Sequence, residues 1–327
     1  MSIALETVDL FYRLICSKSV DDNAAALDVL SDNVRWHAAH PVNDLKGKDP
    51  FMSDYWNPIK SALPDVERQP FIAFEDDYNG RTWVCSMGYL VGSFMNDLFG
   101  IPASKEALFL RYGEFICVED GKITEAYIIP DFLDAMQQVG VFPIRHSLGK
   151  MDSVLPPSTQ DGLSIPDHAI AEGRKTQKLV MDMLHGLGRY DGKSLMSMDM
   201  EKYWHNGFMW YGPAGIGTTR DFYGFREYHQ GPFLLGCPDR SVDEKFTFMG
   251  KGNYAAIGGW PHMHATHTGP NWLGLNPTGK AFELRVFDFW LRQGDKLKEN
   301  WVFIDILHIL DQLGRDVFDE IKRDCDD

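Results

Sequence analysis

The chain has 327 residues with a formal net charge of −15, and 44% of its residues are hydrophobic and 24% charged. This composition is typical of a soluble globular protein, and the length suits two domains of about 150 residues each. The acidic balance argues against nucleic acid or an anionic membrane as the main partner, and no basic stripe reverses it.

The start of the chain and its cysteines indicate a cytoplasmic protein. Residues 1–20 mix apolar residues with Glu6 and Asp9, unlike a secretory signal, and no apolar run reaches the about 18 residues needed to span a bilayer. Five scattered cysteines form no CxxC pair, which disfavours a disulfide framework and a zinc ribbon: Cys16, Cys85, Cys117, Cys237 and Cys325.

The first half of the chain begins with helical periodicity and continues with strands. Apolar residues from Leu10 to Ile15 share one helix face, and a shorter helix is expected over 23–30. A strand around Trp36 and a helix over 49–63 follow. Residues rich in aromatic and β-branched side chains then predict strands over 66–75, 82–91, 107–118 and 123–129, with Asp120-Gly121 as a hairpin turn.

The middle of the chain has the composition of a linker. Four prolines stand among Ser, Gly and Asp: Pro143, Pro156, Pro157 and Pro166. This pattern predicts a first domain over 1–142, a linker over 143–168 and a second domain over 169–327.

The second half repeats the first at a spacing of 174 residues. Its helical face runs from Leu179 to Leu184, and Gly294-Asp295 marks its hairpin. Matches hold one register without a gap, among them Trp36 on Trp210, Phe51 on Phe225, Pro58 on Pro232, Leu110-Arg111 on Leu284-Arg285, Glu125 on Glu299 and Asp131 on Asp305. Such a series indicates a duplication. Helices followed by an antiparallel sheet predict an α+β fold for each copy.

The second copy contains a string that resembles a known family. His267-Thr268-Gly269, followed by Trp272 to Lys280 (WLGLNPTGK) and by Asp305 to Gly314, is similar to the motif of the SnoaL-like polyketide cyclases and ester cyclases of the nuclear transport factor 2-like superfamily. The first copy matches less fully, because its Ala103-Ser104-Lys105 lacks the Thr-Gly before the lysine.

The resemblance implies a fold, a binding mode and an activity. Each copy would be a cone, made of a bent antiparallel sheet wrapped by N-terminal helices, with a hydrophobic small molecule inside. The two cones would pack as an intramolecular pseudo-dimer, and a homodimer of such units is a further option. The family uses no cofactor, and its general acid/base in an intramolecular aldol cyclisation falls on Asp305 and on Asp131.

Strand alternation places these aspartates beside aromatic residues. Glu299, Trp301, Phe303 and Asp305 share one face of the last strand, so Trp301 and Phe303 are expected to line the pocket. Burial would raise the pKa of such an acid and fit it for proton transfer. The alternative is that Asp305 and Asp131 cap the helices that follow them.

A histidine-rich segment provides further candidates. His267 is a candidate to polarise or protonate a substrate carbonyl, and His262 and His264 are candidates for substrate binding. The alternatives are a metal site on His262 and His264, or histidines that are merely hydrogen-bonded in a wall.

Residues on the first strand of each copy are also candidate ligand contacts. Trp210 and Tyr211 occupy this place in the second copy, as do His37 and His40 in the first, although such residues often belong to the core. The repeat also pairs Arg111 with Arg285 and Glu114 with Asp288, on opposite strand faces. Which of the two faces is buried stays open.

These observations lead to one functional hypothesis and one alternative. The hypothesis is a cofactor-independent lyase or isomerase that uses Asp and His on a hydrophobic carbonyl compound, with no metal. The glycine runs contain no nucleotide loop, and no nucleophile elbow appears. The alternative is a non-catalytic protein that binds a small ligand in the same fold.

Overall fold

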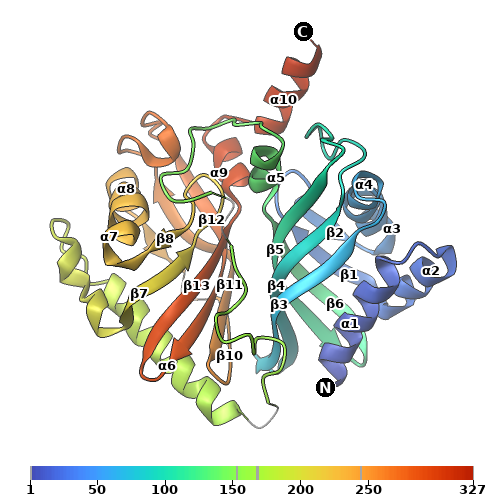
Figure 1. Cartoon of the computed structure of the whole chain (residues 1–327), viewed down its shortest axis with the longest axis horizontal. Helices are drawn as coiled ribbons and strands as arrows, with labels where there is room; N and C mark the ends of the chain where they lie inside the picture. Colours follow the sequence, from blue (N-terminus) through green and yellow to red (C-terminus); the bar gives the residue numbers. More distant parts are fainter. Residues whose placement is uncertain (1, 152–153, 167–168, 244, 327) are drawn as a thin grey trace. The chain divides into compact units, whose positions relative to one another are not determined.

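The chain folds into two compact units. The computed structural model describes residues 2–151, 154–166, 169–243 and 245–326, with the backbone alone over 322–326. The first unit comprises residues 1–141, 160–167 and 315–327, and the second comprises 142–159 and 168–314 (Figure 1). Each has its own sheet and its own helices, which confirms the predicted α+β class.

The division of the chain differs from the predicted boundaries in two respects. Residues of the predicted linker, 143–168, are shared between the units, and residues from 315 onward belong to the first unit. The last helix, α10 (Val317–Asp326), explains the second difference. The Phe318 ring lies 6.3 Å from that of Phe132 and 5.5 Å from that of His40, so apolar burial holds this segment to the first unit.

The helices that precede β3 in the first unit, over residues 3–62, gather along one side of its sheet (Figure 1). Helix α1 begins at the Ser2 cap and buries Val8, Phe11 and Ile15 at helical spacing. The helical elements are α1 (Ile3–Ile15), α2 (Val20–Val29), α3 (Lys48–Pro50), the π-helical turn η1 (Phe51–Trp56), α4 (Asn57–Ala62) and α5 (Phe132–Gln138).

The sheet of the first unit has the order β2-β1-β6-β5-β4-β3. Neighbours are antiparallel except β1 and β6, which are parallel, so the sheet is mixed rather than fully antiparallel as expected. Asp120 and Gly121 form the predicted hairpin turn, both with positive φ. The strands are β1 (Leu30–Ala38), β2 (Asp44–Lys46), β3 (Glu67–Tyr78), β4 (Arg81–Ser93), β5 (Ala107–Glu119) and β6 (Lys122–Pro130).

The second unit has the same plan. Its helical elements are α6 (Ile170–Leu187), η2 (Leu195–Met198), η3 (Met200–Lys202), α7 (Asp221–Phe225), the π-helical turn η4 (Arg226–Gln230), α8 (Gly231–Gly236), η5 (Trp272–Gly274) and α9 (Ile306–Gln312). Its strands are β7 (Trp204–Tyr211), β8 (Thr219–Arg220), β9 (Ser241–Val242), β10 (Thr247–Lys251), β11 (Tyr254–Thr266), β12 (Ala281–Gln293) and β13 (Lys296–Ile304). The sheet order is β10-β11-β12-β13-β7-β8, and β9 pairs with β11.

Strand register repeats at the spacing of 174 residues over much of the fold. Trp36 pairs with Ala126 in the first sheet, and Trp210 pairs with Asn300 in the second. The π-helical turns η1 and η4 also occupy corresponding places. A duplicated sequence therefore folds into a duplicated arrangement.

Strand β11 departs from that spacing. Ser86 pairs with Glu114 in the first unit, but Ile257 pairs with Asp288 in the second, where an unbroken spacing would bring Trp260. A bulge between Gly259 and Met263 then shifts the pairing again. The gap-free sequence match does not extend to the pairing of this strand.

The two faces of the second sheet have different coverings. Trp210 lies 5.7 Å from the ring of Phe225 in α7, so the face that bears Trp210, Asn300 and Asp288 is covered by helices; we call it the helix face. Tyr211 and Trp301 stack on each other on the opposite face.

Two further predictions from the sequence concern membrane-spanning segments and the cysteines. Among the described helices, none is long and apolar enough to cross a membrane. Cys16, Cys85, Cys117 and Cys237 are free thiols, and the side chain of Cys325 lies outside the described residues.

Candidate functional site

The helix face of the second sheet carries an acid in an unusual setting. Asp288 in β12 accepts a hydrogen bond from Asn300 Nδ2 in β13 at 3.1 Å. Burial raises the pKa of Asp288 to about 7, and the hydrogen bond from Asn300 offsets this only in part. Asp288 is therefore divided between its protonated and ionised forms near neutral pH.

The corresponding acid of the first unit is fully engaged. Glu114 is 2.6 Å from Arg68 Nη2 and accepts hydrogen bonds from Ser86 at 2.5 Å and from the Tyr12 hydroxyl. Its exposed fraction is 0%. This buried ion pair with its hydroxyl donors fills the interior of the first unit.

Each of these partners is replaced in the second unit. In the first sheet, Arg68 pairs with Leu90, and Leu90 pairs with Leu110. In the second sheet, Leu284 corresponds to Leu110; it pairs with Met263, and Met263 pairs with Val242. Val242 thus stands where Arg68 stands. Ile257 replaces Ser86 opposite the acid, and the sequence of α6 contains no tyrosine to replace Tyr12.

Aromatic rings surround the same face. His229 in η4 stacks on Trp210 with ring centroids 4.2 Å apart and planes 16° apart, and it lies near Phe233 in α8 at 6.0 Å. Trp290 shares the strand face of Asp288 and is 2% exposed. Within the described part of the chain, Trp290 Nε1 and His229 Nδ1 are buried and have no hydrogen-bond partner.

Side-chain exposure distinguishes the two interiors. Glu114, Tyr55 and Ile59 have exposed fractions of 0%, 1% and 0% in the first unit. Their counterparts 174 residues later, Asp288, His229 and Phe233, are half-buried. On the helix face of the second unit, these three side chains are therefore partly exposed, whereas the first unit buries the corresponding side chains.

The predicted acids Asp305 and Asp131 both cap helices. Asp305 accepts a hydrogen bond from the backbone N–H of His308 at 3.2 Å, and its other oxygen lies 3.2 Å from Arg285. Asp131 caps α5 in the same way and lies 3.9 Å from Arg111. The capping alternative describes both positions, and a catalytic role for either residue stays a prediction.

The pairing of each arginine with a capping aspartate also settles which faces are buried. Arg111 and Arg285 are 2% and 9% exposed, on the face opposite the helices, while Glu114 and Asp288 face the helices. Arg111, Arg285 and Glu114 are buried and each has a charged partner, whereas Asp288 is half-buried and has the neutral Asn300 as its partner.

The strand face expected to line a pocket is covered differently from the prediction. Trp301 Nε1 donates to the carbonyl of Leu155 at 2.8 Å, and Glu299 accepts from the N–H of Ser158 at 3.0 Å. Tyr211 stacks on Trp301, and Phe303 packs on Phe289. The strand face of Glu299, Trp301 and Phe303 is therefore contacted by the segment that contains Leu155 and Ser158. Because side chains alternate along β13, Asn300 and Val302 are the residues that lie on the helix face.

His267 contacts residues 272–280, the segment that resembles the family motif. Its Nδ1 is 3.3 Å from the hydroxyl of Thr278, and its ring is 5.9 Å from that of Trp272. His267 is 0% exposed, and its Nε2 has no partner within the described residues. Burial lowers its pKa, so the imidazole is neutral at physiological pH.

His262 and His264 have separate surroundings. Burial lowers the pKa of His262 to about 4, and His264 Nε2 is 3.0 Å from Asp243. His264 also borders an open depression of ≈ 330 Å³ lined by Asp239, Ser241, His264, Ala265, Thr266, Ala281, Phe282, Glu283 and Gln312. Among the described residues, no three His, Cys, Asp or Glu side chains gather as a metal site would require.

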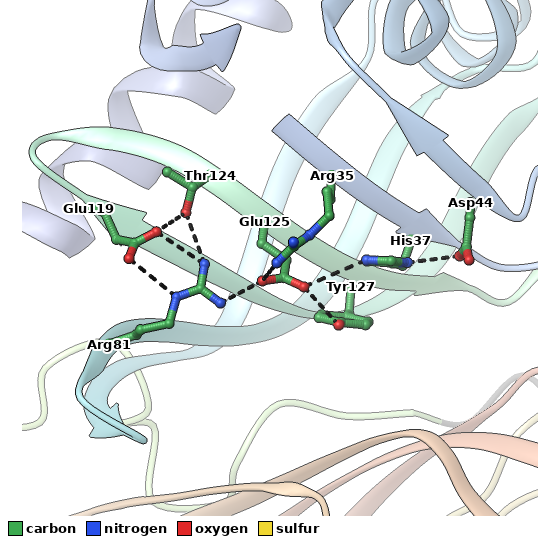
Figure 2. Close-up of polar contacts among 8 residues, drawn as sticks. All are labelled: Arg35, His37, Asp44, Arg81, Glu119, Thr124, Glu125 and Tyr127. Carbon is green, nitrogen blue, oxygen red and sulfur yellow. Dashed lines mark hydrogen bonds and ion pairs between the residues drawn. The ribbon is translucent and has the colours of Figure 1, made fainter. Parts of the chain in front are cut away.

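His37 belongs to a charged network on the first sheet (Figure 2). Its Nδ1 is 2.8 Å from Asp44, its Nε2 is 3.7 Å from Glu125, and its ring stacks on Tyr127 at 4.3 Å. Although burial opposes ionisation, hydrogen bonds hold the pKa of Glu125 well below its usual range; the donors are His37, Arg35, Arg81 and Tyr127. His40 is elsewhere, 3.8 Å from Asp316.

Sequence reasoning therefore missed Asp288, Asn300 and His229 as members of a site. The correspondence of Asp288 with Glu114 was visible in the repeat, but the replacement of the cation Arg68 beside this acid was not. A usable signal was present: Asn300 stands where the first copy has Ala126, and His229 stands where it has Tyr55.

Comparison with known proteins supports the fold-level interpretation of the first unit. Residues 7–139 match the family model described as SnoaL-like polyketide cyclase. No curated protein matches the chain.

Several solved structures are similar to part of the chain. A nuclear transport factor 2-like protein from Burkholderia xenovorans is 18% identical, with 43% of this chain and 98% of that chain covered and a TM-score of 0.34. A candidate polyketide cyclase from Xanthomonas campestris is 19% identical, with 42% and 97% covered and a TM-score of 0.34. A candidate hydroxylase from Streptomyces galilaeus is 20% identical, with 43% and 85% covered and a TM-score of 0.34.

Proposed function

Because residues 7–139 match the family model of the SnoaL-like polyketide cyclases, we propose that the protein is a cofactor-independent lyase or isomerase of the cyclase type. Its substrate would be a hydrophobic small molecule that carries a carbonyl group. The second unit, which repeats the fold of the first, would hold the working site on the helix face of its sheet.

The observation that carries this proposal is the setting of Asp288, which has the neutral amide of Asn300 as its partner where Glu114 has a cation. A carboxyl group with a pKa of about 7 can take a proton and return it within one catalytic cycle at neutral pH. Glu114 in the first unit instead forms a buried ion pair with Arg68 at 2.6 Å. Proton transfer is therefore assigned to the second unit.

The chemistry that fits is proton transfer next to a carbonyl. Ionised Asp288 would remove a proton from the carbon beside the carbonyl, which leaves an enolate. The enolate carbon would attack a second carbonyl carbon of the same molecule, forming one carbon–carbon bond. The new alkoxide would take the proton back from Asp288, so that the net reaction needs no oxidant, reductant or cofactor.

Uncharged donors on the same face would stabilise the enolate. The indole N–H of Trp290 is buried without a partner in the described residues, and a preorganised donor of this kind favours charge that develops in the transition state. Phe233, which is half-buried, would supply apolar surface for the substrate.

Asp305 with His267 stays a second proposal for the acid and the carbonyl contact. It rests on the family resemblance of the string from His267 to Lys280. The helix-cap hydrogen bond and the Arg285 contact engage both oxygens of Asp305. The two proposals make different predictions for single variants.

A non-catalytic small-ligand-binding protein is the alternative function. The capping of both Asp305 and Asp131 favours it, because binding alone leaves those carboxylates free to stabilise helices. A binding protein would retain its ligand unchanged and would catalyse no exchange of ligand protons with water.

Proton exchange tests these possibilities without the natural substrate. The probe is 2-acetylnaphthalene, a hydrophobic ketone whose methyl protons exchange with deuterium oxide through an enolate, followed by NMR. Wild type should accelerate exchange, and Asp288→Asn should lower the rate about 100-fold. Asp305→Asn serves as the matched variant. Loss of exchange in Asp305→Asn with normal rates in Asp288→Asn would assign the chemistry to Asp305, and no acceleration by wild type would favour the binding protein.

A further inference from the structure

His229 stands at a position where the two units have different residue types. It lies in η4, and the corresponding turn η1 has Tyr55 at the position 174 residues earlier. Tyr55 is 1% exposed and packs its ring 5.7 Å from that of Trp36. The smaller imidazole of His229 leaves the ring half-buried instead. The exchange of Tyr for His thus leaves the side chain partly exposed and introduces two ring nitrogens.

Stacking determines what the His229 ring can do. Its plane is within 16° of Trp210 at 4.2 Å and within 9° of Phe233 at 6.0 Å. Because a ring stacked in this way is held in orientation, hydrogen bonds can form only at its edge. Nδ1 has no partner among the residues that the structure describes. A neutral imidazole carries one donor and one acceptor, so this edge has unused hydrogen-bonding capacity.

The imidazole is neutral at physiological pH. Burial lowers the pKa of His229 to about 3, and no carboxylate offsets this effect. The cation that the first unit places in its interior, Arg68, is replaced by Val242. Asp288 lies on the helix face that also carries Trp210, the residue on which His229 stacks, and Asp288 is partly ionised at neutral pH.

We infer that His229 is the residue that contacts the ligand's oxygen in the second unit and that it selects a carbonyl or hydroxyl over a carboxylate or phosphate. An uncharged oxygen satisfies the imidazole edge with one hydrogen bond. An anionic group would meet no positive charge from His229 and would be repelled by ionised Asp288, so its desolvation would remain uncompensated. This inference rests on the proposed site in the second unit.

A matched pair of probes tests the selectivity. 2-Acetylnaphthalene and 2-naphthoate share one ring system and differ in the charge of the oxygen group, and calorimetry at pH 8 measures the affinity of each. Wild type should bind the ketone at least about tenfold more tightly, and His229→Phe should weaken ketone binding about tenfold, the effect of one lost hydrogen bond. His229→Gln, which keeps a donor and an acceptor, should retain more of the affinity.

Controls separate this inference from the proposed reaction. His185→Phe, at an exposed position of α6, should bind both probes as wild type does. Ketone binding that depends on His229, together with no proton exchange in wild type, would support the contact and reject the catalytic proposal. Unchanged ketone affinity in a folded His229→Phe variant, equal affinity of wild type for the two probes, or no ketone binding at all would overturn the inference.

Discussion

Asn300 Nδ2 donates a hydrogen bond to Asp288 Oδ1 at 3.1 Å and a second one to the carbonyl of Phe289 at 3.0 Å. This amide is therefore held by the neighbouring strand and offers the acid a neutral partner in place of a cation. The first unit has Ala126 at the corresponding position, beside an acid that is already paired with Arg68. With a neutral donor in place of a cation, the half-buried Asp288 keeps a raised pKa.

Removal of the Asn300 amide should raise the pKa of Asp288 further. The hydrogen bond favours the ionised form, so Asn300→Ala removes the group that lowers the pKa. The acidic limb of the pH profile for ketone exchange should move to higher pH. Asn206→Ala, at an exposed position of β7, is the matched control and should leave the limb in place. An unchanged limb in Asn300→Ala would show that the amide does not tune the acid.

Asp288 should make the protein less stable as pH rises. Its pKa is about 7 in the folded chain and near 3.8 in an unfolded one, so between these values the folded state holds a proton that the unfolded state has lost. The free energy of unfolding should therefore fall from about pH 4 through pH 7. Asp288→Asn should remove this loss.

Urea denaturation at pH 5 and pH 8 measures the effect. The advantage of Asp288→Asn over wild type should be larger at pH 8, where the wild-type carboxylate must be buried in its charged form. An advantage that is the same at both pH values would mean that the acid titrates near its ordinary value.

Substitution of Asp305 should reduce stability strongly. Asp305→Ala removes a helix cap worth about 1 kcal/mol and leaves Arg285 buried without its carboxylate, which costs about 3 kcal/mol or more. Asp311→Ala, at an exposed position of α9, should change the urea midpoint little. If Asp305→Ala were as stable as Asp311→Ala, the cap and the ion pair would not contribute as described.

The ion pair inside the first unit should show strong coupling. Arg68→Leu leaves Glu114 buried without a cation and should cost about 3–5 kcal/mol, whereas the double variant Arg68→Leu with Glu114→Leu should recover much of this loss. Thermal unfolding of both single variants and the double variant measures the coupling. Additive effects of the two single substitutions would contradict a structural role for this pair.

Much of the fold was predictable from the sequence because its signals are local or repeated. Apolar spacing in residues 10–15 gave helix α1, and Asp120-Gly121 gave the hairpin of β5 and β6. The match of Trp36 with Trp210 gave the duplication. Pairing of β1 with β6 in parallel was not predictable, because such a pair joins residues about ninety positions apart.

The candidate site was harder to predict for a specific reason. Alternation shows that Trp301 and Asn300 lie on opposite faces, but only the packing of Trp210 on Phe225 reveals which face the helices cover. The cation that neutralises Glu114 comes from Arg68, 46 residues away. Val242 takes the place of this cation in the second unit because the pairing of β11 is altered. The gap-free match of the two copies does not show this change.

The packing of the two units as a pseudo-dimer and the presence of a homodimer stay predictions. Light scattering of the full chain tests the second of these. A single species with the mass of one or two chains agrees with the expectation, and a species composed only of trimers would contradict it.

The central claim is that Asp288 changes its protonation near neutral pH, and its titration tests this most directly. Carbon-13 NMR of the aspartate carboxyl groups, with Asp288→Asn used for assignment, follows the ionisation between pH 3 and pH 9. We expect one carboxyl signal that titrates at about pH 7 and is missing in Asp288→Asn. Titration of Asp288 near pH 4, in the ordinary range of an exposed aspartate, would contradict it.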